Sequence, residues 1–146
     1  MAALSITISP VIAAEHRITF HPGGSLGVEF EKLDKWYKAK DTVVIDGVCL
    51  SACTLVTGLI PADRLCATDR AIMGFHSAYS INPLDGSPVF SSEATRLIWQ
   101  IYPKKVRDLL FEAGWEGPQE HMDLVYIPAD KIFKSCNREI EYGEAN

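Results

Sequence analysis

The stretch TVVI at residues 42–45 decides the class of fold. A β-branched run with no polar interruption is typical of a parallel strand that is buried on both faces. Asp46 and Gly47 follow it and would suit a hairpin turn, but no matching strand comes next. Instead, the small and apolar segment 51–58 predicts a helix that packs inside the domain. Together these segments favour an α/β domain with a largely parallel sheet.

Strands and helices alternate on either side of this stretch. A short strand at 18–20 is expected to run into the turn Pro22-Gly23-Gly24, which needs the backbone freedom of glycine. From Ser25 onward, apolar residues recur at helical spacing, which predicts an amphipathic surface helix. Further along we expect strands at 64–67 and 71–75, a loop at 77–90, a helix at 92–114 that Pro103 kinks or divides, and a last unit at 122–133.

The composition is that of one globular domain. With 146 residues, of which 47% are apolar and 23% charged, the chain is long enough to bury one hydrophobic core of ordinary size. The formal net charge of −5 argues against nucleic acid as a partner, because phosphate backbones require a dense Lys/Arg surface. No apolar run reaches the roughly 18 residues that a membrane-spanning helix needs.

Two features bear on the cellular compartment and leave it open. The apolar segment 2–14 could be the core of an export signal, although no basic residue precedes it, and the alternation at 4–8 equally suits a buried first strand. The four cysteines complete no zinc-ligand set, and they would form two disulfides in an exported protein or remain buried thiols in a cytosol. They are Cys49, Cys53, Cys66 and Cys136.

Ser51 and His76 are the candidate catalytic residues. Taken alone, Ser51 stands at the start of a predicted helix, where serine commonly caps the helix with its hydroxyl. A solitary histidine is likewise more often structural than catalytic. As a pair they could act together, since a serine hydroxyl becomes nucleophilic when a base takes its proton, and histidine titrates near neutral pH. A strand-to-helix turn would also direct the helix dipole at developing negative charge.

The order of these motifs resembles one known family. A Pro22-Gly23-Gly24 turn, a helix, a β-branched strand, the pattern Gly47-x-x-x-Ser51-Ala52 and a strand that ends in His76 together resemble the Clp protease proteolytic subunit. His76 follows Ser51 by 25 residues, the interval which that family uses. The resemblance is close over residues 18–80 and loose over 91–133. It implies a ClpP/crotonase-like fold, a mostly parallel sheet flanked by helices.

The resemblance also assigns roles to residues. It implies a serine hydrolase, most readily a peptidase, in which Ser51 is the nucleophile and His76 the base. The acid that orients the histidine falls at Asp123, with Asp130 as the alternative. The amides of Gly23 and Ala52 would then form the oxyanion hole. Neither a cofactor nor a metal is expected.

The same resemblance bears on domains and partners. It implies an N-terminal segment at 1–17 with a shortened first unit, a domain at 18–135 and a tail at 136–146. Peptides or proteins would be the substrates, and copies of the chain would associate through the apolar helix at 92–114. No chaperone-docking motif is recognisable, so an ATPase partner is not inferred. The cysteines around Ser51 resemble an uncharacterised bacterial branch with periplasmic members, which slightly favours export.

Two other interpretations compete with the hydrolase. A crotonase-like enzyme would use similar oxyanion geometry on acyl-coenzyme A, but it would need acidic catalytic residues and a basic patch for the nucleotide. A non-catalytic assembly or binding protein would keep the fold alone.

Overall fold

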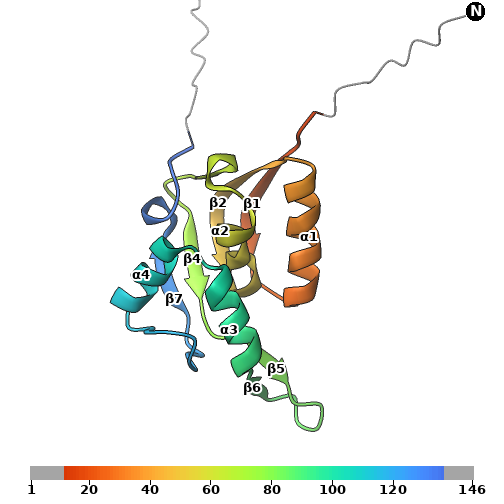
Figure 1. The fold of residues 1–146 in the computed structure, drawn as a ribbon, viewed down its shortest axis with the longest axis vertical. Coiled ribbons are helices and arrows are strands. Elements are labelled where there is room, and N and C mark those ends of the chain that lie inside the picture. The colour runs from red at the N-terminus through yellow and green to blue at the C-terminus, as the bar shows by residue number, and fades with distance from the viewer. Residues whose placement is uncertain (1–11, 137–146) are drawn as a thin grey trace, which may run out of the picture.

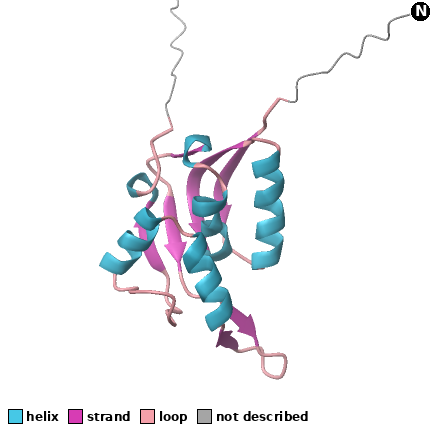
Figure 2. Cartoon of the chain, in the orientation of Figure 1, coloured by secondary structure: helices cyan, strands magenta, loops and turns pink. Residues whose placement is uncertain are grey.

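The computed structural model describes residues 12–136, which form a sheet flanked by helices (Figures 1 and 2). The predicted strand at 4–8 and most of the alternative export-signal segment lie outside the described residues. The strands are β1 (Glu15–His21), β2 (Thr42–Leu50), β3 (Leu65–Ala67), β4 (Ile72–Phe75), β5 (Tyr79–Ile81), β6 (Pro88–Phe90) and β7 (Val125–Pro128). The α-helices are α1 (Leu26–Lys38), α2 (Val56–Leu59), α3 (Ser92–Ile101) and α4 (Lys104–Glu112), and the 3₁₀ turns are η1 (Ser51–Leu55), η2 (Ala62–Arg64) and η3 (Ala129–Lys131).

The main sheet is mostly parallel, as the sequence predicts. Its strand order is β1-β2-β4-β7, and β3 pairs with the first half of β2. The strands β1, β3 and β4 all run parallel to β2, whereas β7 runs antiparallel to β4. In Figure 1, α1 is seen at the β1 end of the sheet and α4 at the β7 end. The chain is therefore a mixed α/β domain with β2 at its centre.

The central strand β2 is longer than the sequence indicates, because it continues through Asp46 and Gly47 to Leu50. A Cβ atom at Gly47 would lie 1.9 Å from the carbonyl oxygen of Thr19, so only glycine allows β1 to approach so closely. The register between the two strands shifts at this point of β1. The Asp-Gly pair therefore accommodates an irregularity in the sheet and does not form a hairpin turn.

The helix predicted from Ser25 is confirmed as α1. The hydroxyl of Ser25 accepts a hydrogen bond from the amide of Val28 and caps the helix. Leu33 on its inner face is fully buried, whereas Val28 and Tyr37 are exposed. The strand before this helix, β1, begins at Glu15, three residues earlier than expected.

Pro103 divides the helical segment at 92–114 into α3 and α4, one of the two outcomes expected. Proline lacks an N–H group and cannot continue a helix, so it stands between the end of α3 and the start of α4. Ile98 and Tyr102 are almost fully buried in the domain, whereas Leu97 is half-exposed. Much of the apolar surface predicted for self-association is thus used inside one chain.

The segment at 77–90 is not a plain loop, because it contains the hairpin of β5 and β6. Its tip is closed by hydrogen bonds from the amide of Gly86 to the carbonyl of Asn82 and from the amide of Asn82 to the carbonyl of Ser87. Each strand has only three residues, too few for alternation to be recognised in the sequence. The hairpin projects beyond α3 at one end of the domain (Figure 1).

All four cysteines form disulfides, so of the two states that the sequence leaves open, disulfides or buried thiols, the structure has the disulfides. Cys49 bonds to Cys53, and Cys66 bonds to Cys136. The first pair is fully buried beside the end of β2, and the second joins β3 to the segment after η3. Within residues 12–136, no helix has the length and apolarity to cross a membrane.

Candidate active site

Three adjacent parallel strands end at the same edge of the sheet and bring the candidate residues together. His21, the last residue of β1, pairs with Cys49 of β2, and Leu50 of β2 pairs with Gly74 of β4. The segments that follow these strands therefore leave the sheet side by side. In open α/β sheets, sites form at this carboxyl edge. Ser51 follows β2 directly, and His76 follows β4 directly.

A cavity of about 280 Å³ opens at this edge, and both Ser51 and His76 line it. Gly24 and Ala52 also line the cavity. Apolar side chains supply much of the remaining wall: Leu26, Leu55, Ile81 and Ile98, together with the rings of Tyr79 and Tyr102. An apolar pocket with a few convergent polar groups is the usual form of a small-ligand or substrate site.

Ser51 has an unusual backbone conformation. Its φ angle is 55°, in the left-handed region that non-glycine residues rarely adopt. Such a backbone costs about 1–2 kcal/mol, and strained residues of this kind cluster at active sites and ligand clamps. Ser51 is the first residue of the short 3₁₀ turn η1, which is followed by one turn of α2, so the single helix predicted here is not formed.

The hydroxyl of Ser51 does not cap this turn. No side-chain capping bond is present at the start of η1, and Oγ makes no hydrogen bond to any described residue. The commonest structural role of a serine before a helix is therefore unfilled here. The backbone carbonyl of Ser51, in contrast, accepts a 2.6 Å hydrogen bond from Thr54 Oγ1. Oγ is thus left free beside the cavity.

A buried chain of hydrogen bonds runs from Tyr102 through Thr54 to the backbone carbonyl of Ser51. Burial raises the pKa of Tyr102 well above its ordinary value, so its hydroxyl stays protonated. Thr54 Oγ1 lies 2.7 Å from that hydroxyl and already donates its own proton to Ser51. Tyr102 is consequently the donor to Thr54, and the chain ends at the Ser51 carbonyl. This support could not be predicted, because Tyr102 is 51 positions from Ser51 in the sequence.

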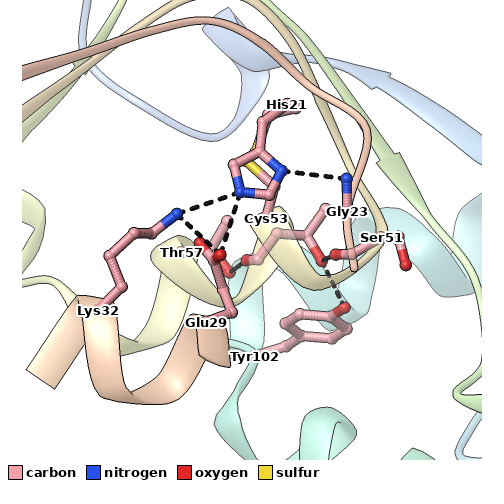
Figure 3. Close-up of a disulfide and its surroundings, with 10 residues drawn as sticks. His21, Gly23, Glu29, Lys32, Ser51, Cys53, Thr57 and Tyr102 are labelled. Carbon is pink, nitrogen blue, oxygen red and sulfur yellow. Dashed lines mark hydrogen bonds and ion pairs between the residues drawn. A yellow bond between two sulfur atoms is a disulfide. The ribbon is translucent and has the colours of Figure 1, made fainter. Parts of the chain in front are cut away.

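His21 holds the Pro-Gly-Gly turn through the amide of Gly23 (Figure 3). The Gly23 N–H donates a 3.0 Å hydrogen bond to Nδ1 of His21, so Nδ1 carries no proton. The proton of a neutral ring is then on Nε2, which lies 3.1 Å from the carboxylate of Glu29. Lys32 approaches the same carboxylate oxygen to 2.8 Å. Glu29 is buried, and its other oxygen, Oε1, has no partner among the described residues.

The Gly23 amide therefore does not face the serine as the resemblance implied, because it is already bonded to His21. Gly24 borders the cavity instead, and its N–H has no hydrogen-bond partner in the part of the chain that the structure describes. Ala52 also borders the cavity, and the first amides of a helical turn lack partners within that turn. Around the cavity, the amides of Gly24 and Ala52 thus have no hydrogen-bond partner among the described residues, whereas the amide of Gly23 has one.

His76 is oriented by a backbone carbonyl. Its Nδ1 lies 2.6 Å from the carbonyl oxygen of Ser77, and because a carbonyl only accepts, Nδ1 must carry the proton. Nε2 of the neutral ring is then an acceptor, the state that a general base requires. The ring of Tyr79 stacks against His76 with 5.6 Å between centroids. No hydrogen bond joins His76 to Ser51 among the described contacts.

Asp123 and Asp130 do not contact His76 among the described residues. Both are exposed, and the backbone carbonyl of Asp123 accepts a hydrogen bond from His121. Asp130 lies in η3, after Pro128, as a first-turn acid. The hydrogen bond from Nδ1 of His76 that an orienting acid would accept is accepted by the backbone carbonyl of Ser77. The described contacts therefore give no support to a carboxylate as third member of the site.

Within residues 12–136, no three His, Cys, Asp or Glu side chains are grouped as a metal site would require. No protein-family model matches this chain, and neither does any curated protein.

Proposed function

We propose that this protein is a serine hydrolase in which Ser51 is the nucleophile and His76 the general base. The observation that supports it best is the state of Ser51. Ser51 has a left-handed backbone, and its hydroxyl makes no hydrogen bond to the described residues. It lines the same cavity as His76, whose Nε2 is free to accept a proton. A helix cap or a structural serine needs none of these properties. We also propose that this mixed α/β domain has a ClpP/crotonase-like fold.

The chemistry would proceed through an acyl-enzyme. Nε2 of His76 removes the proton from Oγ of Ser51 as the oxygen attacks a substrate carbonyl carbon. The oxyanion that forms accepts hydrogen bonds from the amides of Gly24 and Ala52. The tetrahedral intermediate collapses, the leaving group takes the proton from His76, and an ester on Ser51 remains. Water, deprotonated by His76, then releases the acid and restores the serine.

The apolar wall of the cavity supports substrates with an apolar group beside the carbonyl. Leu26, Leu55 and Ile98 would contact such a group. Within the described residues the lining holds no lysine or arginine, so it offers no charge partner to the phosphates of coenzyme A. Peptides or other acyl compounds are therefore favoured over acyl-coenzyme A.

We also propose that copies of the chain associate. Five large apolar residues of this part of the chain are exposed: Leu97 on α3, Phe111 on α4, and Ile81, Leu84 and Val89 on the hairpin of β5 and β6. Sedimentation at high protein concentration would show a species larger than 16.2 kDa.

A fluorophosphonate tests the catalytic proposal. This reagent forms a covalent bond with activated serines, and mass spectrometry identifies the residue that is modified. Labelling at Ser51 is the expected result, and its absence in folded protein would favour the non-catalytic interpretation.

A further inference from the structure

The Cys49–Cys53 disulfide encloses the candidate nucleophile. It closes a ring of the residues from Cys49 to Cys53, and Ser51 is the middle residue of that ring. Both cysteines are fully buried. Figure 3 shows the disulfide at Cys53 among His21, Gly23 and Ser51. This cross-link restricts the backbone of the three residues between the cysteines, Leu50, Ser51 and Ala52.

One end of this cross-link is fixed to the sheet. Cys49 lies in β2, where it pairs with His21 of β1 on one side and with Met73 of β4 on the other. The other end, Cys53, lies in η1, which pairs with no strand. The bond therefore ties a short 3₁₀ turn to the most constrained strand of the domain.

The backbone of Ser51 needs such a constraint. A left-handed residue persists only where its surroundings determine the conformation. Gly23 lies against one side of Ser51, and Thr54 holds the Ser51 carbonyl. The first contact restricts one side of Ser51 and the second acts within η1, whereas the disulfide ties that turn to β2.

We infer that the Cys49–Cys53 disulfide is a positioning element, which holds Ser51 in the conformation that presents its hydroxyl to His76 and to substrate. The inference rests on the proposed function. The second disulfide has a different place: Cys66 and Cys136 are 70 positions apart and only partly buried, and neither borders the cavity. A bond that closes such a long loop restricts the unfolded chain.

The two disulfides offer a matched comparison. The double variants C49A/C53A and C66A/C136A each lose one bond, and both are compared with the wild type below their melting temperatures, with circular dichroism as the check of folding. Fluorophosphonate labelling is measured over a range of probe concentrations. This separates the maximal labelling rate from the probe concentration that gives half of it.

For C49A/C53A the maximal rate should fall about tenfold or more, because small displacements of a nucleophile reduce rates strongly. The half-saturating concentration should stay near the wild-type value, because the apolar wall is unchanged. For C66A/C136A both quantities should stay within about twofold of the wild type, since neither of its cysteines belongs to the five-residue ring that contains Ser51. A general loss of stability would not separate the two quantities in this way.

Unchanged labelling in C49A/C53A would overturn the inference and leave the proposed function intact. An equal fall in both double variants would also overturn it. If C49A/C53A does not fold, C49S/C53S, which is closer in size, takes its place with the same expectations. No labelling in the wild type would overturn the proposed function, and the inference with it.

Discussion

Gly23 lies directly against Ser51. A Cβ atom at position 23 would stand 2.5 Å from Cβ of Ser51 and 3.0 Å from its Oγ, and the φ angle of Gly23 is +96°. Glycine is required there for two separate reasons, space and backbone conformation. The Pro-Gly-Gly turn that follows β1 thus packs directly against Ser51, the residue that follows β2.

The variant Gly23→Ala should lose both stability and labelling. The left-handed backbone alone would cost about 1–2 kcal/mol, and the new methyl group must also displace Ser51. The melting temperature and the fluorophosphonate labelling rate measure the two effects. Gly27→Ala is the control, since Gly27 is an exposed residue of α1 and a Cβ atom there would have one neighbouring atom within 4 Å. Alanine is also favoured over glycine in a helix by about 0.5–1 kcal/mol. Equal behaviour of the two variants would refute this role of Gly23.

Replacing His76 should remove the pH dependence of labelling. In the wild type the labelling rate should rise with pH as the imidazole loses its proton, because only the neutral ring accepts a proton from Ser51. His76→Ala should lower the rate by several orders of magnitude and flatten the profile.

Asp123→Asn is the matched control for that experiment. The carbonyl of Ser77 already accepts the hydrogen bond from Nδ1 of His76, and Asp123 is exposed, so this variant should label at close to the wild-type rate. A loss as large as that of His76→Ala would show instead that a carboxylate orients the histidine.

Protonation of Asp46 should lower the stability of the domain in acid. Hydrogen bonds from Arg70, Arg17 and Thr68 hold the pKa of this carboxyl well below its usual range. A depressed pKa means that the stabilisation is complete above the ordinary aspartate value of about 4 and is lost as the pH falls below it. Asp46→Asn should therefore lower the melting temperature more at pH 7 than at acid pH. The exposed Asp130→Asn should show no such difference, and parallel curves for Asp46→Asn and wild type would contradict the account.

The class of fold could be predicted because the central strand is unambiguous. The run at 42–45 has no polar residue, and helices with clear periodicity flank the sheet. The extension of β2 to Leu50 could not be predicted, because Asp46 and Gly47 have a strong local preference for a turn that contacts with β1 and Arg70 override. The hairpin of β5 and β6 was missed because its strands are too short to show a pattern.

The site was predictable only where a residue follows a strand directly. Ser51 and His76 directly follow two neighbouring parallel strands, β2 and β4, so the topology brings them together. The support from Tyr102, the bond between His21 and Gly23 and the carbonyl that orients His76 depend on packing between distant segments or on local backbone geometry. No spacing in the sequence reports them.

The labelling of Ser51 by a fluorophosphonate tests the central claim most directly. The account predicts that wild-type protein is modified once, at Ser51, and that Ser51→Ala is not modified. The removed hydroxyl makes no hydrogen bond to the described residues, so Ser51→Ala should keep its fold and nearly all of its stability, which circular dichroism and the melting temperature would verify. Modification of Ser51→Ala at the wild-type rate, or no modification of folded wild-type protein, would contradict the assignment of Ser51 as the nucleophile.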